Sequence, residues 1–283
     1  MKSKSGKKSS GAKQELAAYR SSPTGSGLSF RNPPVDEVVC GIRFEPIANF
    51  KIPHFGLLWQ KLGESFPKIE HVAPIASGGN LVIDTASGAP LPRIWFVNES
   101  DDELVQFQVD QLYFNWRRRE RDYPRFASIF PKFEFSKTVL DSLLKELKLP
   151  PVVIVEHELT YINHIPQGQG WSALEDLPKI FPHLSSNKSA FSYLPQPKNL
   201  AWTMRFELPK DQGHLDIRLS QGTKRIDKQP TLLLHLSARG RALSAAWSAS
   251  QSWFALAHDW IVNGFADITA PDIQKSVWRR EDV

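Results

Sequence analysis

Cysteine is almost absent from this chain, since Cys40 is the only one among its 283 residues. A single cysteine cannot form an internal disulfide, and it cannot supply the paired thiolates of a zinc finger. The sequence also lacks any run near the roughly 20 consecutive apolar residues that a membrane-spanning helix requires, and no apolar signal-peptide segment follows its lysine-rich start. These absences predict a cytoplasmic protein that does not engage a membrane.

Local catalytic motifs are missing as well. The chain contains no GxxxxGK[ST] phosphate loop, no GxGxxG, no HExxH, no GxSxG and no kinase signature. Cys40 falls on the apolar side of its segment, which is a poor place for a nucleophile. We therefore assign no catalytic residue and expect no metal and no cofactor. An enzyme of unrecognised type, with a site assembled from distant segments, is kept as a third alternative.

Positive charge is concentrated at the N-terminus. The formal net charge is +5, and residues 1–20 hold six lysines and arginines against Glu15 alone, so the rest of the chain is neutral. Residues 1–27 are rich in Lys, Ser and Gly and are expected to form a disordered basic tail. Two interpretations are open: an electrostatic tether to nucleic acid or another anionic surface, or a solubilising extension.

In the remaining sequence, apolar residues recur first with the spacing of a strand and then with that of a helix, several times along the chain. Val38, Cys40, Ile42 and Phe44 alternate with polar residues, as in a half-buried strand. Further strands are predicted at 93–98, 103–109, 112–116, 152–162, 200–208, 214–220 and 231–237. Helices are predicted after Pro53, at 126–130, at 136–148 with Ser136 as N-cap, at 242–262 and at 271–280.

This order predicts an α+β fold made of two similar halves. The N-terminal half spans 28–150 and the C-terminal half spans 151–283. Each half is expected to be an antiparallel sheet with a long helix packed on one face, and a pseudo-twofold axis would relate the two.

Three segments carry a resemblance to a known family. They are Asn32-Pro33-Pro34-Val35-Asp36-Glu37-Val38-Val39 with Ile42-Arg43-Phe44, Phe114-Asn115-Trp116-Arg117 with Tyr123-Pro124-Arg125-Phe126, and Leu159-Thr160-Tyr161-Ile162-Asn163. In this order, over residues 31 to about 165, they resemble a sporadically distributed family of uncharacterised bacterial and archaeal proteins. That family usually has arginine where this chain has Thr160. The resemblance implies no activity; the patchy distribution of the family implies a setting on mobile elements or in antiphage and toxin–antitoxin loci.

The first candidate site is a cluster of cations and aromatic rings formed by Trp116, Arg117, Arg118, Arg119, Arg121 and Tyr123. Guanidinium groups beside aromatic rings suit a single-stranded nucleic acid or a nucleotide. Alternatively, Glu120, Asp122 and Asp110 neutralise the run as an exposed charge network.

The second candidate lies around His157. Glu156 and Glu158 would share one strand face about 7 Å apart, either as an acid/base pair or as the wet face of a sheet. His157 falls on the apolar face, where a buried, hydrogen-bonded histidine is expected. His164 would point to the opposite face, so joint metal ligation is not expected.

The third candidate is a polar cleft between the halves, formed by Arg43, Asn115, Asn163 and His157. These residues could instead satisfy backbone groups at strand ends. Among the nine tryptophans, Trp253 and Trp278 are interface candidates, and the alternative for both is the ordinary core.

Together these features predict a non-enzymatic binding or assembly protein, set in an antiphage defence or toxin–antitoxin-type system. A protein partner is expected, with a neighbouring gene product as one source, and a homo-oligomer is also open. The alternative is a nucleic-acid-binding protein that uses Arg117–Arg121 and the lysine-rich tail.

Overall fold

The computed structural model describes residues 27–76, 81–84, 87–184, 193–195, 197–223 and 228–282. Apart from Gly27, the predicted basic tail lies outside the described residues. In the part of the chain that is described, no helix has the length and apolar character needed to span a membrane.

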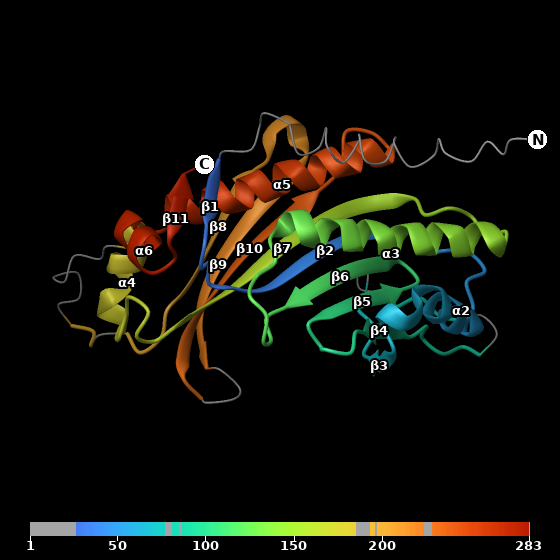
Figure 1. Cartoon of the computed structure of the whole chain (residues 1–283), viewed down its shortest axis with the longest axis horizontal. Coiled ribbons are helices and arrows are strands. Elements are labelled where there is room, and N and C mark those ends of the chain that lie inside the picture. Colours follow the sequence, from blue (N-terminus) through green and yellow to red (C-terminus); the bar gives the residue numbers. More distant parts are fainter. Residues whose placement is uncertain are drawn as a thin grey trace, which may run out of the picture.

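One large antiparallel sheet organises the molecule (Figure 1), and the α+β prediction is confirmed. Its order is β3-β4-β5-β6-β2-β7-β10-β9-β8. The strands are β2 (Val35–Phe44), β3 (Lys68–Val72), β4 (Arg93–Val97), β5 (Glu103–Gln108), β6 (Gln111–Arg117), β7 (Ile154–Pro166), β8 (Ala201–Glu207), β9 (Gly213–Thr223) and β10 (Pro230–Gly240).

The centre of the sheet is the antiparallel pair β2 and β7, in which Val38 lies opposite Tyr161. On one side, β6 returns beside β2 after the meander β3 to β6. On the other side, β10 returns beside β7 after the meander β8 to β10. The segments 28–150 and 151–283 therefore build one continuous sheet, while the similarity of the two halves stays a prediction.

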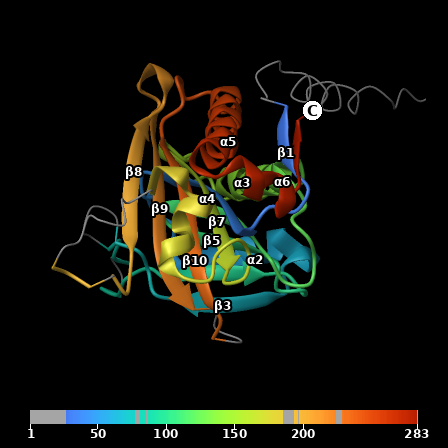
Figure 2. The same cartoon turned by 90° about the vertical axis from the view of Figure 1, so that its left-hand side faces the viewer.

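The helices lie on one face of the sheet, which curves around them (Figure 2). They are α2 (Ile52–Leu62), α3 (Phe126–Glu146), α4 (Leu177–Ile180), α5 (Trp247–Ile268) and α6 (Pro271–Ser276), with 3-10 turns at Gly63–Ser65, Leu174–Asp176, Pro182–Leu184 and Pro209–Asp211. Helix α2 reaches the sheet through Phe55, whose ring centroid lies 5.3 Å from that of Phe107 on β5. Alternate strand residues such as Cys40 and Ile42 are fully buried beneath the helices, as the period of two requires.

Helix α3 corrects the sequence-based boundary. It runs unbroken from Phe126 through Pro131, and the predicted N-cap Ser136 is buried inside it, where its hydroxyl donates to the Lys132 carbonyl at 2.9 Å. Pro131 lies in the second turn and removes a single amide donor, so the aromatic face that α3 buries outweighs the loss.

A two-stranded ribbon near the chain ends completes the fold. Strand β1 (Leu28–Phe30) pairs antiparallel with β11 (Arg280–Asp282) beside α5. Phe265 of α5 lies between the two ends, with ring centroids 5.2 Å from Phe30 and 4.8 Å from Trp278. The ribbon was not predicted, because three-residue strands carry too little periodicity to be seen.

Candidate ligand-binding cavity

A cavity of about 850 Å³ lies between α5, the start of α3, β1 and the central strands. Its walls are mostly apolar and contain Leu28, Ser29, Phe30, Pro33, Val35, Tyr123, Arg125, Phe126, Ala127, Tyr161, Asn163, Leu236, Ser248, Gln251, Ser252, Ala255, Leu256, His258, Asp259, Ile261, Val262 and Phe265. All three segments that carry the family resemblance contribute to it.

The two long helices create this space because they do not contact each other evenly. About two turns into α3 they are joined by Phe133 and Phe254, at 5.3 Å between ring centroids, and by a 2.6 Å hydrogen bond from Gln251 to Glu134. At the N-terminal end of α3, Phe126 stacks on His258 of α5 at 4.5 Å and 15°. Beyond that stacked pair the wall is completed by β1 and the sheet.

A pair of tyrosines supplies hydroxyl groups to the wall. The hydroxyl oxygens of Tyr123 and Tyr161 lie 2.9 Å apart, and one donates a hydrogen bond to the other. Burial raises the pKa of Tyr123 above its ordinary value, so its hydroxyl is protonated at neutral pH. Next to them, the Asn163 amide donates to the Leu234 carbonyl at 3.0 Å, which fixes the side chain.

Charged groups of the cavity come from both long helices. On α5, Nδ1 of His258 lies 3.9 Å from a carboxylate oxygen of Asp259. At the start of α3, the Arg125 guanidinium donates to the Phe30 carbonyl at 2.6 Å and so ties the helix to β1. Arg125 has φ of 75°, a conformation that costs an ordinary residue on the order of 1–3 kcal/mol.

A smaller polar recess of about 340 Å³ adjoins the cavity. It is lined by Arg31, Asn32, Pro33, Arg118, Asp122, Tyr123 and Arg279. Because Pro33 and Tyr123 line both spaces, these two residues form the shared wall between them. The large cavity is thus apolar, and the space beside it is rich in arginine.

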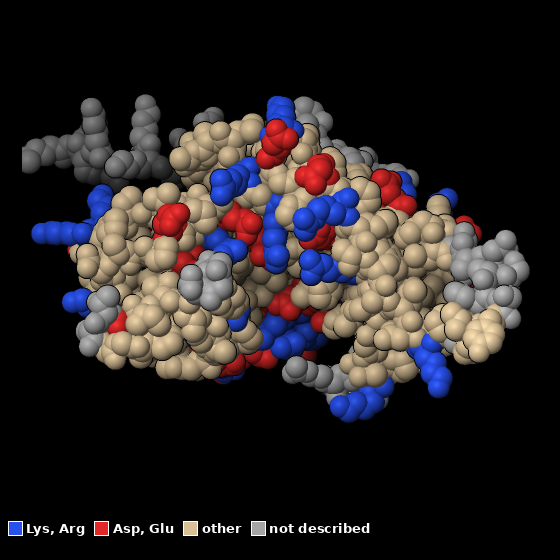
Figure 3. Space-filling view, turned by 180° about the vertical axis from the view of Figure 1, so that it is seen from behind, with Lys and Arg blue, Asp and Glu red and all other residues tan. Residues whose placement is uncertain are grey.

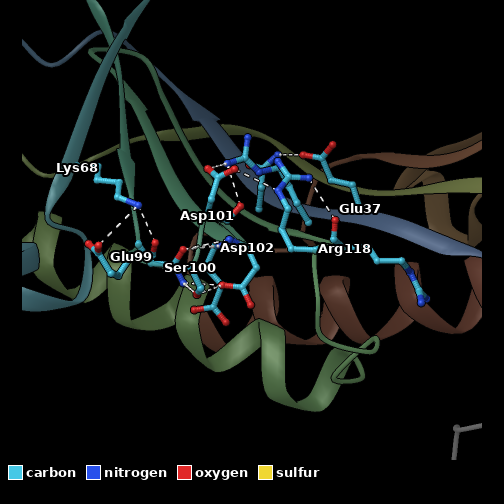
Figure 4. Close-up of polar contacts among 12 residues, drawn as sticks. Glu37, Lys68, Glu99, Ser100, Asp101, Asp102 and Arg118 are labelled. Atoms are coloured by element: carbon cyan, nitrogen blue, oxygen red, sulfur yellow. Dashed lines mark hydrogen bonds and ion pairs between the residues drawn. The ribbon is translucent and has the colours of Figure 1, made fainter. Parts of the chain in front are cut away.

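Three of the four arginines of the predicted cluster form ion pairs with two acids that the sequence did not point to (Figure 4). Asp101 binds Arg117 at 2.7 Å and Arg119 at 3.1 Å, while Asp102 lies 3.8 Å from Arg121. The charge-network interpretation is therefore favoured, although Asp101 and Asp102, from the loop before β5, take the place of Glu120 and Asp110.

The aromatic members of that cluster do not form a stacking surface. Trp116 is only 1% exposed, because it lies on the helix side of β6 with Phe114, so the stacking role predicted for it is wrong. Tyr123 is half-buried and engaged with Tyr161. Arg118 points elsewhere, donating to the carbonyls of Val35 and Pro33 at 2.9 Å and 3.2 Å.

His157 lies where the sequence placed it, on the buried face of β7. Its Nε2 is 2.9 Å from the Ser250 hydroxyl of α5, and its ring lies 5.2 Å from that of Trp253. Burial lowers the pKa of His157 to about 4, so the ring is neutral at pH 7. His164 faces the other way, with Nδ1 3.4 Å from Asp36.

The opposite face of the sheet is the wet one (Figure 3), with side chains of both charges interleaved across it. Glu156 pairs with Arg43 at 3.3 Å, and Glu158 pairs with Arg239 at 3.1 Å. The two glutamates are therefore members of a surface ion-pair network, the second of their two interpretations.

The four residues of the predicted polar cleft do not meet. Arg43 and Asn115 lie on the sheet face away from the helices, where Asn115 is buried and donates to Glu37 at 2.5 Å, whereas His157 and Asn163 lie on the helix face. The prediction of a shared cleft is wrong because strand position alone decides which face a side chain takes. Only Asn163 lines the cavity.

Both tryptophans predicted for an interface are core residues, so that prediction is wrong. Trp253 is 0% exposed and donates its indole hydrogen to the Gln212 carbonyl at 2.9 Å. Trp278 is 1% exposed and packs on Phe265 beneath the terminal ribbon. Trp253 is covered by the sheet, where its ring lies 5.2 Å from that of His157 on β7.

The sequence did not point to Arg125, His258 or Asp259 as site residues. The three motif segments were the signal that could have led to the site, because each of them contributes residues to the cavity wall. Among the described residues, no group of three or more histidine, cysteine, aspartate or glutamate side chains is placed to hold a metal ion.

No protein-family model matches the chain, and no curated protein matches it either. A similar solved structure is that of DynU16, a protein in the dynemicin biosynthetic locus, with 11% sequence identity and a TM-score of 0.27 over 82% of this chain and 96% of that one. A similarity at this level supports no conclusion about function. The resemblance to the sporadically distributed prokaryotic family and its defence-type setting stays a prediction.

Proposed function

We propose that this chain is a binding protein for a small, largely apolar organic molecule that occupies the cavity between α3, α5 and the sheet. The observation that carries this proposal is the cavity itself. Its volume of about 850 Å³ falls within the range of roughly 300–1,000 Å³ that is usual for small-molecule sites. Leu256, Ile261 and Val262 from α5 and Leu236 from β10 offer such a ligand apolar contact.

A few convergent polar groups would orient the ligand. Gln251, held by Glu134 at 2.6 Å, and the hydroxyls of Tyr123 and Tyr161 reach the wall from three different elements. The Tyr123 hydroxyl is protonated at neutral pH, and burial raises its pKa further, so it offers a neutral hydrogen-bonding group to a ligand.

The nucleic-acid alternative has less support from the described residues. Asp101 and Asp102 form ion pairs with Arg117, Arg119 and Arg121, which reduces the positive charge that this cluster offers to a phosphate. Single-stranded recognition also needs an accessible ring on which a base can stack, and Trp116 is buried. The protein partner expected from the sequence stays a prediction.

Titration with Nile red, an uncharged fluorescent probe, tests the proposal on the full chain. We expect saturable binding with increased fluorescence, and we expect A255W, which places an indole in the cavity, to weaken it at least about tenfold, or about 1.4 kcal/mol. The matched control is S128W, which puts the same side chain on an exposed position of α3 outside the cavity.

Absence of saturable binding would contradict the proposal. Equal affinities for A255W and S128W, with both variants folded by circular dichroism, would contradict it as well, because the probe would then bind elsewhere.

A further inference from the structure

Positive charge gathers at the end of the cavity where β1, the segment after it and the start of α3 meet. Arg125 lies in the cavity wall itself, and Arg31, Arg118 and Arg279 line the adjoining recess. An apolar cavity bordered by cations has the chemistry to bind a molecule with an apolar body and an acidic end.

Arg125 is the cation closest to the apolar space. One of its terminal nitrogens donates to the Phe30 carbonyl. Among the described residues no carboxylate lies within ion-pair distance of Arg125, and its side chain is exposed at the cavity. Since a guanidinium has five N–H donors, this group keeps donors for a ligand.

The recess strengthens the positive potential next to Arg125. Arg118 is fixed in place by the carbonyls of Val35 and Pro33, while Arg279 is exposed and its side chain forms no hydrogen bond or ion pair within the described ranges. The main chain of Arg279 is held by the Arg31 amide, which donates to its carbonyl at 3.0 Å.

The acids that face these arginines leave an excess of positive charge. Glu281 forms an ion pair with Arg31 at 2.5 Å, and a carboxylate oxygen of Asp122 lies 3.7 Å from the Arg118 guanidinium. Among the described residues that line the cavity, the one acid is Asp259, on α5 beside His258.

We propose that the ligand is an anionic amphiphile, with its apolar body in the cavity and a carboxylate held by Arg125, assisted by Arg279 across the wall formed by Pro33 and Tyr123. This inference rests on the proposed function and adds the chemical class of the ligand. Arginine suits the role because its planar N–H pair matches a carboxylate, whereas a neutral head group would leave the cation unpaired.

Displacement of Nile red by decanoate and by decanol, which differ only in the head group, tests the inference. The titrations are run at about 0.15 M salt, where the Debye length is about 8 Å and distant charges are screened. We expect decanoate to bind the unaltered protein about tenfold more tightly than decanol, as for a hydrogen bond to a charged group.

Three variants assign that preference to particular side chains. R125Q is expected to abolish most of the preference, measured as the ratio of the decanoate and decanol affinities of the same variant. R279Q removes a side chain that makes no contact within the described residues, so folding should be unaffected, and a reduction of about threefold is expected. R218Q makes the same change of charge on the wet face of β9 and should leave the preference unaltered.

Equal displacement by decanoate and decanol would overturn the inference, and so would a preference that survives both R125Q and R279Q. Neither result would affect the proposed function, which fails separately if Nile red does not bind or if A255W does not weaken its binding.

Discussion

Tyr123 and Tyr161 are 38 positions apart in the sequence, yet their hydroxyl oxygens lie 2.9 Å from each other in the cavity wall. Tyr123 precedes α3, and Tyr161 comes from the middle of β7, directly opposite Val38 of β2. This contact joins two of the three segments that carry the family resemblance. It fixes the start of α3 over the sheet and thereby keeps the cavity open at that end.

Removal of one hydroxyl should therefore cost stability. Y123F deletes the hydrogen bond and leaves the Tyr161 hydroxyl without this partner, and we expect the free energy of unfolding to fall by about 0.5–1.5 kcal/mol. Urea denaturation followed by tryptophan fluorescence measures the change. The control is Y193F, which removes the same group from a side chain that is 94% exposed, and no change is expected there.

The buried ring of His157 makes stability depend on pH. Its pKa is lowered to about 4, below the value of about 6.5 expected in the unfolded chain, so unfolding takes up a proton between these values. The contribution of His157 to stability is fully present above about pH 6.5 and is lost as the pH falls toward 4, by at most about 1.4 kcal/mol per pH unit.

Comparison of the unaltered protein with H157Q isolates this effect from the carboxylates. Urea unfolding at about pH 7 and about pH 5 should show a smaller loss of stability for the variant on acidification. Identical pH slopes would mean that His157 titrates normally in the folded protein.

Gly41 is required by a close approach on the wet face of the sheet. Tyr113 lies directly opposite it on β6, and a Cβ added to Gly41 would fall 1.8 Å from the Tyr113 ring. We expect G41A to lower the free energy of unfolding by about 1–3 kcal/mol, the usual cost of overpacking.

The matched control is G56A. This residue lies within α2 and nothing comes within 4 Å of an added Cβ, so the same methyl group should stabilise the protein by roughly 0.5–1 kcal/mol. If the two variants unfold at the same denaturant concentration, Tyr113 does not pack over Gly41.

The arginines paired with Asp101 should have a structural role. The double variant R117A/R119A removes both ion-pair partners of the Asp101 carboxylate. We expect it to retain as much labelled single-stranded RNA on a filter as the unaltered protein does, and to lose a small amount of stability. A nucleic-acid-binding protein would instead lose retention and show a smaller salt slope. A filter-binding titration over a range of salt concentrations measures both quantities.

Periodicity in the sequence predicted strands β2 and β4 to β10 and most of the two long helices, because one buried face imposes a period of two or of 3.6 residues on each element. Strand β3 was not predicted, since four of its five residues are exposed and no apolar alternation marks it. The same alternation placed His157 and His164 on opposite faces. It also contradicts the predicted cleft, since Arg43 and Asn115 occupy the wet positions of their strands.

What could not be predicted depends on pairings between distant segments. Trp278 is buried next to the terminal ribbon, and Asp101 and Asp102 form ion pairs with three arginines. Neither contact leaves a pattern in the sequence around the residues that make it. The cavity is the extreme case, since its wall begins at Leu28 and ends at Phe265. No single window of sequence holds enough of it to be recognised.

The most direct test of the cavity as a ligand site is a crystal structure of the full chain with decanoate that carries bromine on its terminal carbon. We expect an anomalous bromine peak between α3 and α5, next to Leu256 or Val262, with the carboxylate at Arg125. A bromine peak confined to the outer surface, with no density for the acid between the two helices, would contradict it.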